Sequence, residues 1–188
     1  MGSRGRQPSG KMTRRAVFLD RDGTLNKGVI MDGRLYPPPT LAEFSLLDGV
    51  EEAVHRLKAV PFRLVVVTNQ PDVATGRQER AVVEAMHDRL RELLPVEDIR
   101  VCYHTDADGC DCRKPKPGML RAAAEALGLD LASSYMIGDR WRDVGAGRAA
   151  GCRTIYLRNG YDEPPAVDYD LAVESLIEAS AAILAGRV

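Results

Sequence analysis

The sequence predicts an α/β fold of three layers, in which helices cover both faces of a Rossmann-like parallel sheet. Short apolar runs alternate with amphipathic segments of helical period, a pattern typical of strands joined by crossover helices. Polar residues follow directly after several of these apolar runs. A length of 188 residues suits one domain. We expect a single domain over residues 13–188, after a disordered leader at 1–12.

The apolar runs are expected to be buried strands, because each is short and almost continuously apolar. The predicted strands span residues 16–19, 62–67, 99–103, 135–137 and 154–157, with a short edge strand at 169–172. Residues 21–47 show no clean period and contain a run of three prolines, so we expect loops there.

Amphipathic patterns predict the helices between these strands. They cover residues 50–57, 78–94, 117–127, 142–150 and 174–184. Asp48 or Gly49 is a suitable cap for the first helix, and Gly128 ends the third. His55 and His87 lie within helical patterns, where packing or surface positions are expected.

The composition is that of an ordinary globular protein. The formal net charge is −1, which gives no signal for nucleic acid or for an anionic membrane surface. No apolar run approaches the ~20 residues that span a bilayer. We therefore expect a monomer in the cytoplasm that binds neither nucleic acid nor membrane, and whose cysteines stay reduced.

Two carboxylates follow the first predicted strand. Asp20 and Asp22 are separated by one residue, and Gly23 permits a tight turn after them. Alone, such a pair is usually a turn or a cap. Asp139 follows the fourth strand, and parallel strands bring such positions to one edge of the sheet. The sequence therefore predicts a Mg²⁺ site that uses Asp20, Asp22 and Asp139.

A second metal site is predicted between residues 102 and 112. Cys102, His104, Cys110 and Cys112 supply three thiolates and one imidazole, a donor set that tetrahedral Zn²⁺ prefers. Four protein ligands leave no open position for catalysis, so this zinc would stabilise a loop. Ordinary buried or disulfide-bonded cysteines are the alternative, and Cys152 is expected to be a buried thiol.

The order of these motifs resembles the haloacid dehalogenase superfamily. The motifs that carry the resemblance are Asp20-x-Asp22-Gly23-Thr24, Thr68-Asn69, Lys114, and Gly138-Asp139 with Asp143. The run Cys112-Arg113-Lys114-Pro115 and the cysteine cluster before it resemble the branch of heptose-bisphosphate and histidinol phosphatases. Neither segment between the first three strands has room for a large cap domain.

The resemblance implies a Mg²⁺-dependent phosphatase that forms an aspartyl-phosphate. Asp20 would be the nucleophile and Asp22 the general acid and base, with the Asp22 backbone carbonyl as its magnesium ligand. Thr68 and Lys114 would contact the transferred phosphoryl group, and Asp139 would bind Mg²⁺, with Asp143 behind it. The expected substrate-binding residues are Arg21, Asn69, Gln70, Arg113 and Arg140.

The expected partner is a small phosphorylated metabolite. A sugar bisphosphate is favoured, because its second phosphate needs several cations and the sequence offers arginines near the motifs together with Lys116 and Arg158. The expected reaction is removal of the C7 phosphate of a heptose 1,7-bisphosphate. Histidinol phosphate is the alternative, since the short loop between His104 and Cys110 resembles that group. A polynucleotide 3′-phosphatase and a zinc-stabilised interaction module without activity remain further alternatives.

Overall fold

The computed structural model describes residues 14–158 and 160–188. Within them six strands form one sheet, in which all neighbouring pairs run parallel, in the order β5-β4-β1-β6-β7-β8. The strands are β1 (Arg15–Leu19), β4 (Phe62–Asn69), β5 (Asp98–Cys102), β6 (Tyr135–Gly138), β7 (Arg153–Leu157) and β8 (Leu171–Val173). The predicted parallel α/β fold is confirmed, whereas the predicted leader lies outside the described residues.

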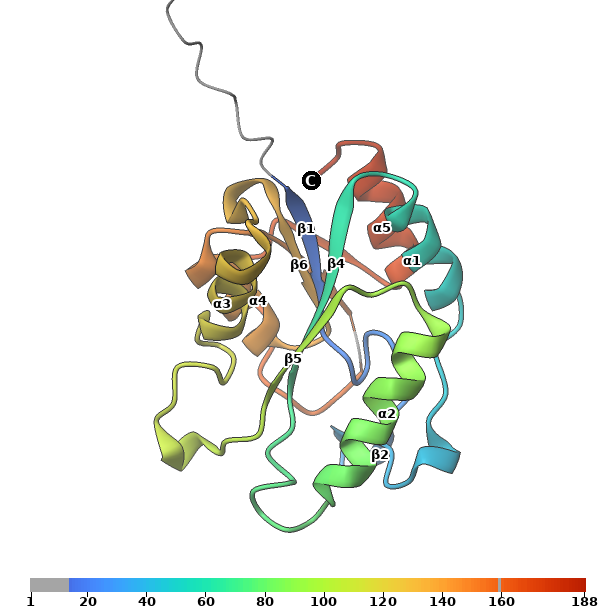
Figure 1. The fold of residues 1–188 in the computed structure, drawn as a ribbon, viewed down its shortest axis with the longest axis vertical. Coiled ribbons are helices and arrows are strands. Elements are labelled where there is room, and N and C mark those ends of the chain that lie inside the picture. Colours follow the sequence, from blue (N-terminus) through green and yellow to red (C-terminus); the bar gives the residue numbers. More distant parts are fainter. Residues whose placement is uncertain (1–13, 159) are drawn as a thin grey trace, which may run out of the picture.

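Helices cover both faces of the sheet (Figure 1). One layer contains α1 (Val50–Lys58), α2 (Arg80–Leu93) and α5 (Leu176–Leu184), and the other contains α3 (Gly118–Leu127) and α4 (Trp141–Ala150). Short 3-10 turns occupy Leu41–Glu43, Leu131–Ser133 and, between β5 and α3, Asp106–Asp108. In the described part of the chain, no helix has the length and apolar character needed to cross a membrane.

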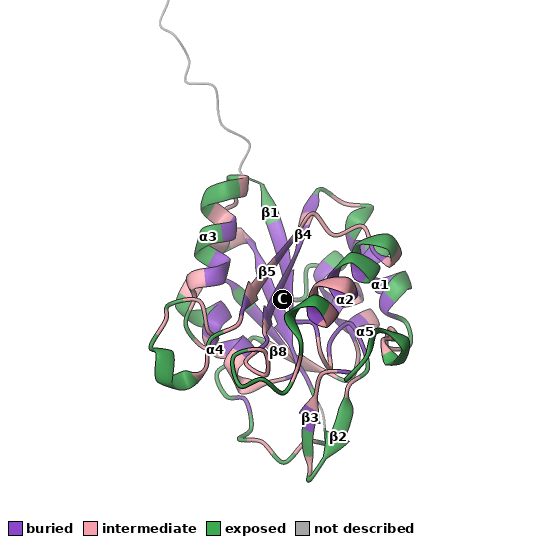
Figure 2. Cartoon of the chain, turned by 60° about the horizontal axis from the view of Figure 1, so that its bottom comes forward, coloured by how far each residue is buried: buried purple, intermediate pink, exposed green. Residues whose placement is uncertain are grey.

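A hydrophobic cluster fills the space on each side of the sheet, and β1 contributes to both. Val17 and Leu19 belong to the cluster under α1 and α5, whereas Ala16 and Phe18 belong to the cluster under α3 and α4. Figure 2 shows that the central strands are buried while the outer helix faces are exposed. Full burial of each large apolar side chain stabilises the fold by roughly 1.5–3 kcal/mol. The central strands are therefore a firm base for the residues that follow them.

The segment between β1 and α1 differs from the prediction of loops. It contains an antiparallel hairpin of β2 (Val29–Met31) and β3 (Arg34–Tyr36). Asp32 and Gly33 form its two-residue turn, with φ angles of 49° and 73°. Positive φ at both central residues is the requirement of the type I′ turn, which Asp-Gly meets. This dipeptide was the signal for the hairpin in a segment that otherwise lacks a period.

The polar residues that were expected to converge do lie at one edge of the sheet. Asp20 and Asp139 directly follow β1 and β6, which are paired neighbours. Thr68 lies near the end of β4, on the other side of β1, and Cys102 ends β5. All these strands point in the same direction, so their carboxyl ends form one site.

Candidate active site

Asp20 and Lys114 form a buried ion pair at the centre of the site. Lys114 Nζ donates a hydrogen bond to Asp20 Oδ1 at 2.6 Å. The same ammonium group donates to Asp143 Oδ1 at 2.5 Å and to the Val67 carbonyl at 2.8 Å. Burial alone would lower the pKa of Lys114, but the Asp143 and Asp20 carboxylates raise it. The lysine therefore stays charged beside the predicted nucleophile.

Three carboxylates gather around this lysine. Asp20, Asp139 and Asp143 each offer an oxygen, and these oxygens lie within 4.8 Å of one another. Burial, together with the charges of Asp20 and Asp143, raises the pKa of Asp139 well above its usual value. Burial and the Asp20 charge raise the pKa of Asp143 to about 6, although Lys114 opposes this shift. A divalent cation would relieve the repulsion, and oxygen ligands suit Mg²⁺, so the residues fit the predicted ion.

Two glycines let these carboxylates approach the backbone. Gly23 has a φ of 86°, and a Cβ at this position would overlap Asp139 Oδ2. Gly138 ends β6, where a Cβ would overlap the Asp143 carboxyl group. The Asp143 carboxylate also accepts a hydrogen bond from the Arg140 backbone N–H at 3.0 Å. The acidic side chains are therefore fixed by the backbone that surrounds them.

The Asp22 carboxylate is held by donors on both of its oxygens. Arg21 Nη2 donates to Oδ1 at 2.9 Å and to Oδ2 at 2.8 Å. Asn26 Nδ2 donates to Oδ1 at 2.9 Å, and Gln70 Nε2 donates to Oδ2 at 2.7 Å. Burial would raise the pKa of Asp22, but the Arg21 charge and these hydrogen bonds lower it. This arrangement favours the ionised carboxylate, the form that can take a proton from water.

Gln70 links Asp22, the predicted general acid and base, to the end of β4. Besides its bond to Asp22, its side chain donates to Thr68 Oγ1 at 2.8 Å. Its backbone N–H donates to the Cys102 carbonyl at 2.7 Å. Thr68 and Gln70 are both buried and line the cleft above Asp20. Thr68, whose hydroxyl is predicted to bind the phosphoryl group, therefore lines the same cleft as Asp20, the predicted nucleophile.

Arginines line the cleft that opens above these residues. Arg113, Arg140 and Arg142 form part of its wall. A second hollow adjoins the cleft, shares these three arginines and adds Arg34 from the hairpin. Arg113 and Arg140 are substrate contacts predicted from the sequence, whereas Arg34 and Arg142, which line the same space, were not among the predicted contacts. Their signals were the Asp-Gly turn beside Arg34 and the position of Arg142 at the start of a predicted helix.

Acidic side chains partly compensate these arginines. Asp106 Oδ1 accepts hydrogen bonds from Arg113 Nε at 2.8 Å and from Arg142 Nη1 at 3.2 Å. Arg140 forms an ion pair with Glu163 at 3.2 Å. The side chains are thereby held in fixed orientations along the cleft. An anionic group that enters the cleft would compete with Asp106 and Glu163 for the guanidinium groups.

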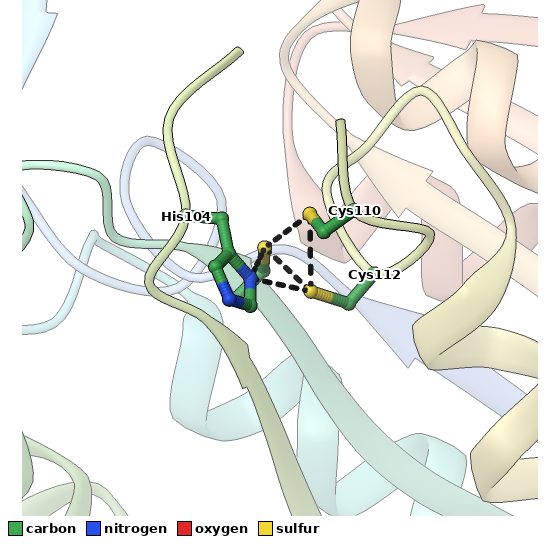
Figure 3. A group of neighbouring side chains, drawn as sticks. His104, Cys110 and Cys112 are labelled. Carbon is green, nitrogen blue, oxygen red and sulfur yellow. Dashed lines mark hydrogen bonds between the residues drawn. The ribbon is translucent and has the colours of Figure 1, made fainter. Parts of the chain in front are cut away.

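The cysteine and histidine side chains of the predicted zinc site point toward one another (Figure 3). Cys112 Sγ lies 3.4 Å from Cys110 Sγ and 3.2 Å from His104 Nδ1, and 2.8 Å from Cys102 Sγ. Cys102 Sγ lies 3.7 Å from Cys110 Sγ and 3.6 Å from His104 Nδ1. A zinc tetrahedron with Zn–S bonds of ~2.3 Å has edges of about 3.7 Å. The other donor distances, 3.2–3.7 Å, come near this value, whereas the 2.8 Å between Cys102 Sγ and Cys112 Sγ would have to lengthen when a metal ion binds.

Without a metal ion, Cys102 and Cys112 favour their protonated thiol forms. Burial, and then the hydrogen bond with Cys112, raises the pKa of Cys102. Burial also raises the pKa of Cys112. Thiolates so close together are stable only if a cation compensates them, as a zinc ion does. Lys116 Nζ donates to the carbonyls of Gly109 and Cys110 at 2.8 and 2.7 Å and closes the loop.

The predicted substrate contact Arg21, and the cations Lys116 and Arg158 that favoured a bisphosphate, have other places in the structure. Arg21 is fully buried behind Asp22 and is absent from the cleft wall, so its expected contact with substrate is corrected to support of Asp22. Lys116 is engaged by loop carbonyls, as described above. Arg158 forms an exposed pair with Glu174 at 2.7 Å and does not line the cleft. The presence of a charged residue near a motif therefore did not identify which side chains line the cleft.

Comparison with known proteins agrees with this geometry. The HAD-hydrolase-like family model matches residues 111–179. The D-glycero-beta-D-manno-heptose-1,7-bisphosphate 7-phosphatase of Pseudomonas aeruginosa is 41% identical over 154 residues, which cover 79% of this chain and 84% of the relative. The Escherichia coli (strain K12) protein of the same name is 36% identical over 183 residues, 89% of this chain and 93% of the relative.

A solved structure shares the fold over nearly the whole chain. The D,D-heptose 1,7-bisphosphate phosphatase of B. bronchiseptica, complexed with magnesium and phosphate, superimposes with a TM-score of 0.77 and 31% identity. The match covers 92% of this chain and 99% of that protein. With its own carboxylate cluster and buried lysine at the strand ends, this chain belongs to the haloacid dehalogenase-like hydrolases, in the same family as these heptose bisphosphate phosphatases.

Proposed function

We propose that this chain is a Mg²⁺-dependent phosphatase that removes the C7 phosphate of D-glycero-D-manno-heptose 1,7-bisphosphate. The observation that carries the proposal is the buried group of Asp20, Lys114 and Asp143 beneath a cleft that is lined by arginines. The names of the curated relatives support the heptose substrate. A bisphosphate suits the cleft, because its second phosphate can pair with guanidinium groups beyond the reacting centre.

In the first step an oxygen of Asp20 attacks phosphorus in line, and the bond from phosphorus to the sugar oxygen breaks. Asp22, which is ionised in the free site, takes up a proton from the solvent as the negatively charged substrate phosphate binds beside it, and gives this proton to the sugar oxygen as the sugar leaves. Water then attacks the phosphorus of the aspartyl-phosphate while Asp22 takes a proton from it, and inorganic phosphate is released. Lys114 and the Thr68 hydroxyl stabilise charge on the phosphoryl oxygens through both steps.

Asp20, Asp139 and the backbone carbonyl of Asp22 would hold the Mg²⁺ ion, with Asp143 fixing Lys114 beside them. When bound, the ion neutralises negative charge on the transferred phosphoryl group and lets it approach the carboxylates. Asn69 fixes the Lys114 backbone, and Gln70 fixes Asp22, so both predicted substrate-binding residues also orient the catalytic groups. Arg113 and Arg140 remain the proposed contacts to the rest of the substrate.

We also propose that Cys102, His104, Cys110 and Cys112 bind a structural Zn²⁺ ion. The convergence of their four donor atoms, which all lie within 4.8 Å of one another, supports this assignment. The last ligand is followed directly by Arg113 and Lys114, so the metal would position both residues. Monomeric state and cytoplasmic location remain predictions from the sequence.

Phosphate release from a panel of substrates tests the proposal. The panel contains both anomers of heptose 1,7-bisphosphate, histidinol phosphate, fructose 1,6-bisphosphate and a 3′-phosphorylated oligonucleotide. Histidinol phosphate is the second candidate, because Glu163 and Asp162 beside the arginines could meet its cationic group. We expect the highest kcat/KM for a heptose bisphosphate. A higher value for histidinol phosphate would reject the proposed substrate but keep the phosphatase chemistry, and no release from any compound would reject both.

A further inference from the structure

Two buried basic residues, Arg21 and His87, lie behind the site, and the proposed chemistry uses neither of them directly. Arg21 follows the nucleophile in the sequence, yet its side chain is fully buried. His87 lies on α2 and is also fully buried, so of the two positions expected from the sequence, packing or surface, it has the packing position. A buried guanidinium is costly unless partners satisfy its donors. The partners of Arg21 therefore indicate its role.

The Arg21 guanidinium bridges two side chains. On one side Nε and Nη2 donate to the carboxylate of Asp22, and on the other side Nη1 donates to His87 Nε2 at 3.0 Å. A planar guanidinium has fixed donor directions, so two partners at opposite ends define its orientation. The orientation of Asp22 then depends on the position of His87, which lies 66 residues away in the sequence.

The polar environment of His87 fixes its tautomer. Nε2 accepts from Arg21, so the ring proton must be on Nδ1, which faces Glu84 Oε2 at 3.4 Å. Glu84 is held in turn by the Tyr103 hydroxyl, which donates to Oε1 at 2.5 Å. Burial and the Arg21 charge lower the pKa of His87 to about 4. The imidazole is therefore neutral at physiological pH and can remain an acceptor for Arg21.

We propose that His87 and Arg21 are positioning residues for the reaction: His87 fixes the Arg21 guanidinium, and Arg21 fixes the Asp22 carboxylate toward the leaving group and the attacking water. Asn26 and Gln70 complete the donors around this carboxylate, but both are neutral amides. The ion pair with Arg21 is the strongest of these contacts, since a charged bidentate pair exceeds neutral hydrogen bonds. The inference rests on the proposed function, because it assigns a purpose to the orientation of Asp22.

The test uses two matched substitutions of His87. In His87→Gln the side-chain amide reaches the position of Nε2 and can still accept from Arg21. In His87→Asn the amide corresponds to the position of Nδ1 and leaves Arg21 Nη1 without its acceptor. His55→Asn on α1 is the control, because His55 is exposed and outside the cleft. Thermal unfolding of each variant shows which of them keep the native fold.

Two substrates separate positioning of Asp22 from a general structural effect. Heptose 1,7-bisphosphate has an alcohol leaving group that needs a proton, whereas the p-nitrophenolate of p-nitrophenyl phosphate leaves without one. For His87→Asn we expect a fall of about tenfold or more in kcat with the heptose bisphosphate, and little change in KM. The first turnover of p-nitrophenyl phosphate should change by less than about threefold, and His87→Gln should restore both rates.

Crystal structures of the two variants give a reading that does not depend on turnover. We expect the Asp22 carboxylate to leave Arg21 in His87→Asn and to keep its place in His87→Gln. An unchanged Asp22 in both structures would overturn the inference, as would an equal loss with both substrates in both variants. If the wild-type protein released no phosphate, while Asp22 moved only in His87→Asn, the proposed function would fail and the positioning would stand.

Discussion

Asn69 and Lys114 hold each other by two reciprocal hydrogen bonds. Asn69 Nδ2 donates to the Lys114 carbonyl at 3.1 Å, and the Lys114 backbone N–H donates to Asn69 Oδ1 at 3.1 Å. The last residue of β4 thus fixes the backbone of a lysine that comes from a loop beyond β5. The ammonium group reaches Asp20 from this fixed backbone.

Loss of this clamp should reduce catalysis more than stability. In Asn69→Ala we expect phosphate release to fall by about tenfold or more, because Lys114 is no longer held within hydrogen-bond distance of the transferred group. The free energy of unfolding should fall by only about 1–3 kcal/mol, as for other lost buried hydrogen bonds. Steady-state kinetics and urea unfolding measure the two quantities. A parallel loss of both, in proportion, would assign Asn69 to the fold alone.

Asp20→Asn should abolish phosphate release, because an amide cannot form the aspartyl-phosphate.

Asp22→Asn should act differently, since Asp20 is still able to attack a substrate with a good leaving group. With p-nitrophenyl phosphate we expect the covalent intermediate to accumulate in Asp22→Asn, because no base activates the water. Intact-protein mass spectrometry detects the added phosphoryl group. Turnover by Asp20→Asn would disprove the assignment of the nucleophile.

Zinc should be present in the purified protein and should be lost in Cys110→Ala. Removing one ligand from a closed tetrahedral site destabilises the whole loop, because metal binding contributes to folding free energy. Activity should fall with the zinc content, since Arg113 and Lys114 follow the last ligand. Cys152→Ala is the matched control, because this buried thiol lies outside the cluster and should keep the metal. Full activity without zinc would refute the role of the loop.

The buried imidazole should make stability depend on pH. The pKa of His87 is lowered from 6.5 to about 4 in the folded protein, under burial and the charges of Arg21 and Arg91, which Glu84 partly opposes. The unfolded chain therefore binds the proton first as pH falls, and the contribution of the neutral imidazole is lost between pH 6.5 and 4. By pH 5 the free energy of unfolding should have fallen by roughly 2 kcal/mol from this cause.

Unfolding in urea at pH 7 and pH 5 measures this effect. His87→Gln removes the titrating group but leaves Arg21, Glu84 and Arg91 in place, so it serves as the reference. We expect the wild-type protein to lose more stability than His87→Gln over this range. Equal losses of stability in the two proteins would show that other titratable groups, and not His87, cause the loss of stability at acid pH.

The main lines of the fold could be read from the sequence, because each strand is a short apolar run and each helix has an apolar face. The convergence of Asp20, Thr68 and Asp139 followed from the parallel direction of the strands. The hairpin was missed, since its residues have no apolar period and only the Asp32-Gly33 pair marks its turn.

The direction of single side chains was harder to predict. Arg21 lies between the two proposed catalytic carboxylates in the sequence, and adjacency alone did not show that its side chain turns away from the cleft. The burial of His87 did have a signal, because Val83, His87 and Leu90 share the helical spacing of one buried face. The apolar neighbours at that spacing indicate that the imidazole is buried. They do not indicate its partner, Arg21, which comes from the distant end of β1.

The contact of Gly23 with Asp139 limits how this site can vary. A side chain at position 23 would occupy the space of the Asp139 carboxylate, so each substitution there must displace an acidic group. Asp143 restricts Gly138 in the same way. The acidic side chains therefore lose their conformational entropy when the chain folds, and they lose little more when the cation binds. We expect the three carboxylates to have the same positions in the apoprotein and in the magnesium-loaded protein. The affinity for the ion would then depend on how the backbone holds these side chains.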